Sequence, residues 1–242
     1  MSTPVTYSVG DGVAHIAMDD GKVNVMSLAI LESLHDAFDR AARDQAMVVF
    51  SSARDGIFSA GFDLKVFAAK DVAGSVAMVR AGAELALKLL TFPRPVLSIC
   101  SGHAYPMGAF LLLSSDLRIG TSGSYTIGFN EVAIGIPVPS FALELGRARM
   151  HPAWLSRAAT TGEMFGPQDA VSAGYLDMLV PRQALDETVR SSIETLQKVH
   201  QPSHATVKQR LHGATVELIR SKIESELTVE AYLQREGSRT AQ

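Results

Sequence analysis

Hydrophobic and polar residues alternate over the first part of the chain and then change to a helical period. The alternation lies on both sides of Gly10-Asp11-Gly12, which predicts two strands joined by a hairpin turn. Apolar residues then recur at three- and four-residue spacing over residues 28–43, with Ser27 as the expected N-cap of an amphipathic helix. The apolar run at residues 47–50 is typical of a strand buried on both faces of a parallel sheet.

The same alternation of helix and strand continues to about residue 180. A helical period over residues 72–90 ends before Pro93 and Pro95, and residues 96–100 follow as a second buried strand. Further elements are expected in the order helix, strand, strand, helix, helix and strand, at residues 108–113, 117–119, 124–127, 153–160, 167–173 and 175–180. Alternating strands and helices predict an α/β fold with a mostly parallel sheet.

After Pro181 the pattern becomes purely helical, with a break at Gln201-Pro202 and no further strand signal. One side of the last predicted helix, residues 216–235, is apolar and must be covered by the body or by another subunit. This side carries Leu218, Ile219, Ile223, Leu227 and Tyr232. We expect residues 1–195 to form the core and residues 196–242 to form a helical C-terminal region for packing and oligomerisation.

Composition narrows the class of protein. Of the 242 residues, 47% are hydrophobic, which indicates a globular protein with a sizeable core. The 22 Lys and Arg residues against 25 Asp and Glu residues give a net charge of −3, which provides no basic field for a nucleic-acid backbone. No apolar run approaches the roughly 20 residues of a membrane helix, and the N-terminus has no apolar signal segment. We expect a cytoplasmic protein that binds neither nucleic acid nor membrane.

Motifs for metals and resident cofactors are missing from the sequence. Cys100 is the single cysteine, which excludes an internal disulfide and a cysteine-based metal cluster and fits a reducing compartment. None of the seven histidines forms an H-x-x-x-H pair with a glutamate, so no zinc site is expected. The chain has no G-x-G-x-x-G after its first strand, no Walker phosphate loop and no G-x-S-x-G elbow. We therefore expect no metal and no resident cofactor.

Two loops of small residues, at 58–65 and 102–109, each follow a predicted buried strand. Glycine and alanine let a ligand approach the backbone, and a chain that turns from strand into helix leaves amide N–H groups unpaired. Two such loops can aim two donors at one oxygen atom. The alternative is that both are ordinary strand-to-helix turns.

Both loops resemble those of the crotonase, or enoyl-CoA hydratase/isomerase, superfamily. Phe58-Ser-Ala-Gly-Phe-Asp-Leu-Lys65 is similar to that family's first oxyanion-hole loop, and Gly102-His-Ala-x-x-x-Gly-Ala109 with Ser115-Asp-Leu-Arg-Ile119 is similar to its second. Residues 166–177 resemble the family's A-x-x-A-x-x-x-G-L-V-D segment, and Asn24 stands where the family usually has an asparagine. The resemblance implies a spiral of ββα units with a helical trimerisation region, and therefore a homotrimer or a dimer of trimers. It also implies an acyl-CoA substrate, with coenzyme A present only as part of the thioester.

The resemblance further implies roles for individual residues. The thioester oxygen would receive the backbone N–H groups of Phe62 and Met107, although the family usually has glycines where this chain has Pro106 and Met107. Lysines would neutralise the CoA phosphates, and the candidates are Lys22, Lys65 and Lys208. The other expected substrate-binding residues are Ser59, Ala60, Gly61, Asp63, Gly108, Phe110 and Asn130.

The acid–base residue distinguishes the reactions of this family. Its hydratases use two glutamates, and the first of these positions aligns with Phe110, which cannot transfer a proton. The second is Glu131, in a Gly-x-Asn-Glu segment that looks most like the Δ3,Δ2-enoyl-CoA isomerase branch. Moving one proton between C2 and C4 needs one carboxylate, whereas adding water needs a second group to hold and activate the water. We expect an isomerase with Glu131, Phe62 and Met107 as its catalytic groups.

Other interpretations stay open. The protein can be an enoyl-CoA hydratase or another lyase or hydrolase of the same family, or a non-catalytic acyl-CoA-binding protein. Asp63 can act as a helix cap, Glu144 and Glu163 as solvated side chains, and Asp116 as a hydrogen-bonding residue at a strand start. The aromatic residues that would line an acyl pocket, unless they only pack in the core, are Phe67, Phe110, Phe129, Phe141 and Trp154.

Overall fold

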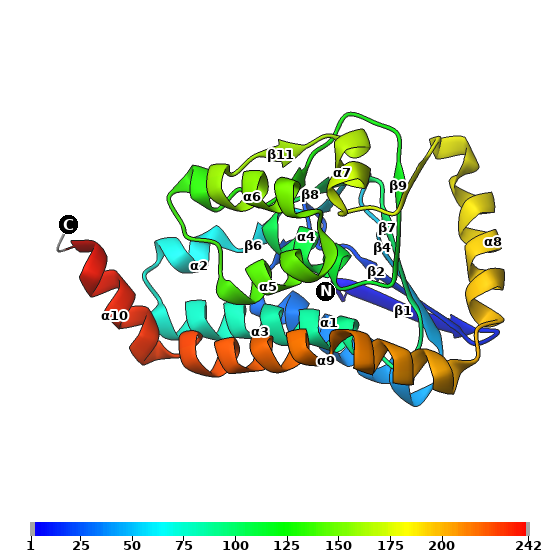
Figure 1. The fold of residues 1–242 in the computed structure, drawn as a ribbon, viewed down its shortest axis with the longest axis horizontal. Helices are drawn as coiled ribbons and strands as arrows, with labels where there is room; N and C mark the ends of the chain where they lie inside the picture. The colour runs from blue at the N-terminus through cyan, green and yellow to red at the C-terminus, as the bar shows by residue number, and fades with distance from the viewer. Residues whose placement is uncertain (1–2, 241–242) are drawn as a thin grey trace.

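Three β-sheets form the framework of the computed structural model, which describes residues 3–240 (Figure 1). The largest sheet has the strand order β1-β2-β4-β7-β9-β12, with bounds Val5–Gly10, Val13–Met18, Met47–Ser52, Val96–Cys100, Leu117–Thr121 and Met178–Val180. β1 and β2 pair antiparallel, and the other neighbouring strands in this sheet pair parallel. The predicted hairpin and the mostly parallel sheet are therefore confirmed.

Two smaller sheets hold short strands that connect to the candidate loops. One has the order β11-β10-β8-β5, with bounds Met164–Phe165, Ile127–Gly128, Gly102–Ala104 and Gly56–Ser59. In the other, β3 (Val25–Met26) pairs with β6 (Gly61–Phe62). The chain passes from β4 into β5, and from β7 into β8, before the next helix begins. Each such unit places one strand in the large sheet and the next strand in a small sheet, which is the predicted ββα arrangement.

Helices cover both faces of the large sheet (Figure 1). Their bounds are α1 Leu28–Arg43, α2 Leu64–Ala68, α3 Val72–Leu90, α4 Pro106–Leu113, α5 Ser140–Arg149, α6 Pro152–Thr161, α7 Pro167–Ala173, α8 Leu185–Gln197, α9 Gln201–Glu226 and α10 Val229–Thr240, with short 3₁₀ turns η1 Val132–Ile134 and η2 Arg182–Ala184. The main core lies on the face of α1, α3 and α4, whereas α8 packs Val189 and Ile193 against the opposite face. α9 lies against α3 and α5.

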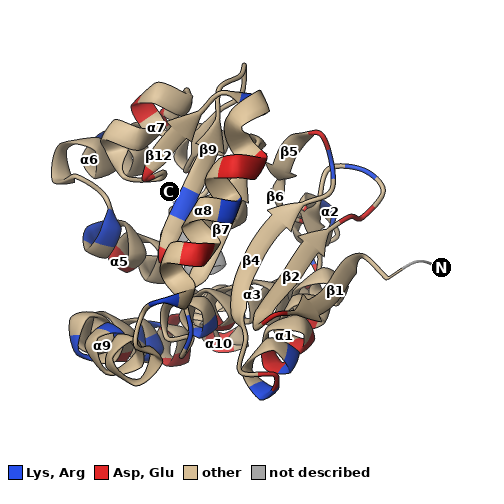
Figure 2. Ribbon diagram, turned by 90° about the vertical axis from the view of Figure 1, so that its right-hand side faces the viewer, with Lys and Arg blue, Asp and Glu red and all other residues tan. Residues whose placement is uncertain are grey.

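Four strands of the large sheet have no charged side chains. Strands β1, β2, β4 and β7 contain no Lys, Arg, Asp or Glu, whereas α1, α8 and α9 carry these residues (Figure 2). Ser27 caps α1 by accepting the amide of Ile30, as predicted. The buried face of α1 reaches the sheet through Phe38, whose ring packs edge-on against Phe50 of β4 at 5.7 Å between centroids.

The helices at the C-terminal end of the chain have other bounds than the sequence predicts. α9 begins at Gln201 with proline in its first turn, where the missing N–H has no cost. It then continues to Glu226, so the predicted bounds of a last helix at 216–235 are wrong: the backbone leaves the helix at Leu227 (φ −101°, ψ 55°) and α10 follows. The division of the chain at residue 195 stays a prediction. Among the described residues, no helix combines the length and the apolar character needed to cross a membrane.

One buried side chain, Asn24, joins three strands at the edge from which the first candidate loop departs. Its Nδ2 atom lies 3.4 Å from the carbonyl of Met18 in β2, 2.8 Å from the hydroxyl of Ser52 in β4 and 3.1 Å from the carbonyl of Phe58 in β5. The backbone of Asn24 has φ +52°, a left-handed conformation that asparagine tolerates better than most residues. The amide group therefore fixes both the turn and the start of the loop.

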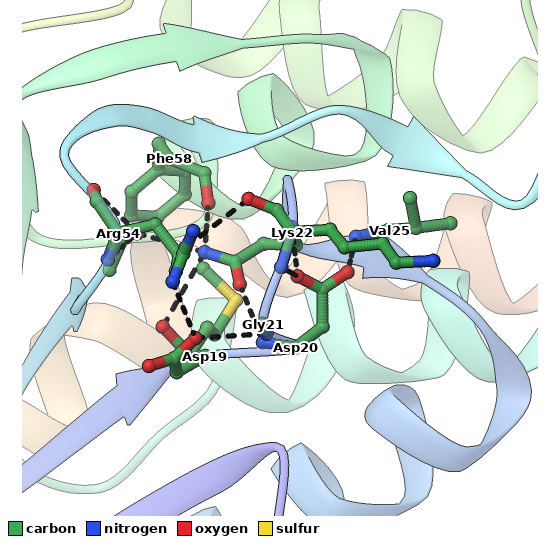
Figure 3. Close-up of polar contacts among 10 residues, drawn as sticks. Asp19, Asp20, Gly21, Lys22, Val25, Arg54 and Phe58 are labelled. Atoms are coloured by element: carbon green, nitrogen blue, oxygen red, sulfur yellow. Dashed lines mark hydrogen bonds and ion pairs between the residues drawn. The ribbon is translucent and has the colours of Figure 1, made fainter.

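The turn around Asn24 is held by backbone donors to a carboxylate (Figure 3). Asp20 accepts the amides of Lys22 (2.7 Å), Asn24 (2.8 Å) and Val25 (2.9 Å). Burial alone would raise the pKa of Asp20, but these three donors outweigh it and lower that pKa below its ordinary value. Arg54 closes the outer side of the turn by donating to the carbonyl of Lys22 at 3.2 Å. These hydrogen bonds fix the turn that supports the start of the first loop.

Replacing Asn24 by Ala is expected to lower the free energy of unfolding by about 3 kcal/mol, because buried acceptors on neighbouring strands lose their donor. Chemical denaturation measures the loss. Gln45→Ala is the matched control, since Gln45 also has a positive φ (+51°) but an exposed side chain. Its cost should stay within about 0.5 kcal/mol. Equal losses in the two variants would show that backbone strain, and not the amide, explains the effect.

Candidate active site

The first loop runs from β5 through β6 into α2. Ser59 is buried, and its hydroxyl donates to the carbonyl of Asn24 (2.8 Å) and accepts the amide of Gly61 (3.1 Å). Gly61 has φ +85°, which L side chains rarely adopt, and a Cβ added there would lie 3.5 Å from the Pro106 ring. The loop is therefore held by the Asn24 turn on one side and meets the second loop on the other.

The second loop runs from β8 into α4. Its Tyr105 amide donates to the carbonyl of Ser59 at 2.9 Å, which bonds the two loops together. α4 begins at Pro106, and Tyr105 at its N-cap provides no side-chain cap. The first amides of a helix have no acceptor within the helix, so the Met107 N–H can serve an external acceptor. Gly108 lets this helix approach the first loop, since a Cβ there would lie only 2.9 Å from the Cβ of Ser59.

The two predicted amide donors, Phe62 and Met107, lie on these adjoining loops. Their side chains meet at Gly82 of α3, where an added Cβ would lie 2.7 Å from the Phe62 ring and 2.9 Å from the Met107 sulfur. The Met107 side chain is fully buried there. The methionine that replaces the usual glycine is thus accommodated against α3. The use of both amides as an oxyanion hole stays a prediction.

Glu131, the predicted base, directly precedes η1 and follows β10. Its side chain is 7% exposed, and its Oε2 atom is buried without a hydrogen-bond partner. Burial raises the pKa of Glu131 to about 7, although the residue's own backbone N–H partly offsets the effect. The carboxyl group is therefore able to gain and lose a proton near neutral pH.

Most of the aromatic residues considered for an acyl pocket lie in the core. Phe110 is fully buried and packs edge-on against Phe129 (5.0 Å between centroids) and Phe141 (5.4 Å). Trp154 is partly buried and packs against Phe165 in the same way at 5.2 Å. The position at which a hydratase would carry its first glutamate is therefore filled by a buried apolar ring.

The remaining predicted substrate-binding residues lie on the first loop or in turns elsewhere in the chain. Asp63 caps α2 by accepting the amide of Lys65 at 3.0 Å, as its alternative interpretation predicted. Lys65 and Lys22 are exposed, one in the first turn of α2 and the other in the turn before β3. Ala60 and Asn130 are half-buried. Both lysines are therefore free to reach a solvent-exposed phosphate.

The two weaker acid–base candidates are already ion-paired. Glu144 pairs with Arg147 at 2.5 Å, and Glu163 pairs with Arg157 at 2.5 Å. The Glu163 side chain is on the surface, while that of Glu144 is less exposed than predicted. Both carboxylates are therefore engaged by guanidinium groups of neighbouring side chains, unlike Oε2 of Glu131.

Lys208 lies away from the two loops. Its ammonium group is buried and donates to the Asp116 carboxylate (2.7 Å) and to the carbonyl of Leu89 (3.1 Å). Asp116 directly precedes β9 and accepts the amide of Val96 at the start of β7, as a strand-start hydrogen bonder should. This pair therefore marks the amino edge of the parallel strands, whereas the loops leave the carboxyl edge. Lys208 is thus buried and paired away from the loops, and its contact with a CoA phosphate stays a prediction.

Tyr175 is a buried polar residue that sequence analysis did not single out. It is fully buried, and its hydroxyl has no hydrogen-bond partner. The segment 175–180 was predicted as a strand, but β12 begins only at Met178 and leaves Tyr175 in the turn after α7. The alternating pattern of a short segment does not reveal which hydroxyl ends away from water, so no sequence signal marked this residue.

Two hollows on the surface lie outside the loop region. One, of about 470 Å³, is lined by the first half of α9 together with Asp116 and Arg149. The other, of about 230 Å³, is lined by Gly12, Arg94 and neighbours. Neither is lined by residues of the two loops. Within residues 3–240, no group of three His, Cys, Asp or Glu side chains could hold a metal ion.

Known proteins show the same loops and fold. The enoyl-CoA hydratase/isomerase family model matches residues 8–240. The human mitochondrial enoyl-CoA delta isomerase 1 is 28% identical over 214 residues, which cover 87% of this chain and 71% of that protein. A probable enoyl-CoA hydratase from Mycobacterium tuberculosis superposes with a TM-score of 0.92 at 34% identity, covering 99% of this chain and 100% of the other. A second structure of the same M. tuberculosis protein, described there as an enoyl-CoA isomerase, gives a TM-score of 0.86 at 36% identity, covering 93% of this chain and 97% of the other.

Replacing Lys208 by Met is expected to lower the free energy of unfolding by about 3 kcal/mol, because the Asp116 carboxylate loses its buried counter-ion. The affinity of the Lys208→Met variant for coenzyme A, measured by calorimetry, should stay unchanged. Lys65→Met is the matched control, since this exposed lysine lies on the first loop. The Lys65→Met variant should bind coenzyme A more weakly and keep nearly the wild-type stability. Loss of coenzyme A affinity in Lys208→Met, at unchanged stability, would instead support a contact between Lys208 and a CoA phosphate.

Proposed function

The chain belongs to the enoyl-CoA hydratase/isomerase family and is therefore an enzyme. Within this family, we propose that it is a Δ3,Δ2-enoyl-CoA isomerase. The observation that carries the proposal is a single buried carboxyl group, Glu131, combined with an apolar ring at Phe110. One carboxyl group suffices to move a proton from C2 to C4 of an acyl-CoA, and no water is added. The substrate is the CoA thioester, and no further cofactor is needed.

The proposed reaction uses the ionised form of Glu131. The carboxylate takes a proton from C2 of a 3-enoyl-CoA, and the electron pair of the broken C–H bond moves towards the thioester oxygen. Backbone N–H groups of Phe62 and Met107 stabilise this enolate. Glu131 then returns the same proton to C4, which leaves the double bond between C2 and C3 and regenerates the carboxylate. Each oxyanion donor contributes roughly 3 kcal/mol and the base a factor of roughly 10² to 10⁴.

The pKa of about 7 that burial gives Glu131 supports this dual role. A base with an ordinary carboxyl pKa is almost fully ionised at neutral pH but attracts a C2 proton weakly. A group with a pKa near the working pH is both available as the base and a better proton acceptor. The same carboxyl group can then release the proton to C4 at a similar free-energy cost.

Hydration, or another lyase or hydrolase reaction, is the second candidate. It stays a candidate because the similar Mycobacterium tuberculosis protein is described as a probable enoyl-CoA hydratase in one structure and as an enoyl-CoA isomerase in another. A hydratase would need a second group to hold the attacking water. The burial of Phe110 among Phe129 and Phe141 argues against such a group at that position.

The proposed assembly is a homotrimer or a dimer of trimers in the cytoplasm. α9 leaves large apolar side chains exposed on its outer surface: Val207 at 59%, Leu211 at 70% and Leu218 at 41%. Apolar groups exposed together on one helix favour coverage by another subunit. The single buried cysteine, Cys100, is compatible with a reducing compartment.

Glu131→Gln should reduce isomerisation of 3-enoyl-CoA by 10² to 10⁴-fold, because the amide keeps the size of the side chain but removes its basicity. Affinity for acyl-CoA should change little. Mass spectrometry of the products distinguishes isomerisation, which leaves the mass unchanged, from hydration, which adds one water. Glu187→Gln, on the surface of α8, is the control and should behave as wild type. Isomerase activity within threefold of wild type in Glu131→Gln would contradict the mechanism.

Light scattering at micromolar concentration should give three or six times the chain mass of 25.9 kDa. Leu211→Glu should shift the protein towards monomer, because a carboxylate would replace apolar surface in the interface. Val9→Glu introduces the same charge at an exposed position of β1 and should leave the assembly intact. A wild-type mass near that of one chain would refute the proposed trimer.

A further inference from the structure

Two polar groups of complementary character are buried without partners in the same part of the core. The Tyr175 hydroxyl can donate a hydrogen bond, and the Glu131 carboxylate can accept one. Neither the Tyr175 hydroxyl nor Oε2 of Glu131 has a partner in the described structure. Buried groups without partners carry a large desolvation penalty and are rare in folded proteins. A donor and an acceptor left unpaired side by side therefore indicate a contact that forms during function.

Ring contacts hold the Tyr175 side chain towards Glu131. The Tyr175 ring packs edge-on against Phe129 at 5.6 Å between centroids and an interplanar angle of 88°. It also lies against Phe165 of β11 at 6.1 Å. Phe129 is only two residues before Glu131 in the chain. The Tyr175 ring therefore packs against the segment that follows β10 and carries Glu131.

The protonation states assign the direction of any hydrogen bond between them. Burial first, and then the charge of Glu131, raise the pKa of Tyr175 well above its ordinary value. Burial raises the pKa of Glu131 to about 7. Tyr175 thus keeps its proton over the whole range in which Glu131 gains and loses one. Towards the ionised carboxylate, the hydroxyl is always the donor.

Other charged groups on the adjacent elements do not account for the behaviour of Glu131. On α6, which packs against η1, Arg157 pairs with Glu163 and lies over the ring of Trp154. On α7, Asp169 is exposed. No charge from these residues contributes to the raised pKa of Glu131, which burial explains. Tyr175 is therefore the neighbour best placed to adjust the proton affinity of the carboxyl group.

We propose that Tyr175 is a positioning residue for the proton shuttle, and that its hydroxyl donates to Oε2 of ionised Glu131 when substrate is bound. Active-site hydrogen bonds are often long or poorly aligned before substrate binds and tighten in the complex. Holding one carboxylate oxygen leaves the other to take the proton from C2 and to return it to C4 on the same face of the acyl chain. The inference rests on the proposed role of Glu131.

The test compares Tyr175→Phe with wild type by two measurements. The first is the pH dependence of kcat for isomerisation, which reports the enzyme–substrate complex. It should rise tenfold per pH unit below the pKa of Glu131 and level off above it, since the base must be ionised. The second is direct NMR titration of the ¹³C-labelled Glu131 carboxyl group in the complex with a substrate analogue, assigned by its loss in Glu131→Gln. Removing the donor destabilises the carboxylate, so both transitions should move upward by about one pH unit.

Tyr125→Phe is the matched control. Tyr125 is also buried, but its hydroxyl donates to the carbonyls of Thr121 (2.7 Å) and Cys100 (3.3 Å). This variant should lose stability while both transitions stay in place. Tyr175→Phe, which removes a hydroxyl without partners, should melt at or above the wild-type temperature. A purely structural role for Tyr175 would give the opposite melting result and no upward movement of the titration.

The outcomes separate this inference from the proposed function. A Glu131 titration in substrate-analogue-bound Tyr175→Phe within about 0.3 pH unit of wild type would overturn the inference, because one unit corresponds to a tenfold change in proton affinity. If the titration moves upward while Glu131→Gln retains isomerase activity, Tyr175 does act on Glu131 and the proposed reaction is wrong. If the titration and the pH profile of kcat move together, both stand.

Discussion

The side-chain amide of Asn24 is the interaction on which the candidate site depends. It joins the ends of β2, β4 and β5, and the carbonyl of the same residue accepts the Ser59 hydroxyl. Ser59 in turn holds Gly61 through its hydroxyl and Tyr105 through its carbonyl. A continuous series of hydrogen bonds therefore links one buried amide to both loops. In a low-dielectric interior such bonds reinforce one another, and the loss of one is costly.

Burial has opposite effects on stability and on chemistry at Glu131. The surrounding apolar groups contribute to the main core, yet they oppose ionisation of the carboxyl group. Because the folded-state pKa is raised from 4.5 to about 7, the folded state binds more protons than the unfolded state over that interval. Stability therefore falls as pH rises between these values. The rest of the core must offset this loss for the enzyme to keep an ionised base at neutral pH.

The sequence predicts the regular part of the fold better than its short strands. The hairpin around Gly10-Asp11-Gly12 and the capped helix after Ser27 have clear periods and turn residues, and both are present. β6 and β10 have two residues each, too few to show a period, and tertiary pairing alone defines them. The burial of Lys208 could not be predicted, because a lysine looks exposed in a sequence until its partner is known. The partner, Asp116, lies 92 positions away.

The Lys208–Asp116 pair and the candidate loops also lie in two separate electrostatic environments. It lies at the amino edge of β9, and the candidate loops leave the carboxyl edge of the same sheet. A five-residue strand such as β9 spans about 16 Å. No charge from Asp116, His204, Lys208 or His212 contributes to the raised pKa of Glu131. Natural variation can remodel the charges around α9 without retuning the proton chemistry at the other end.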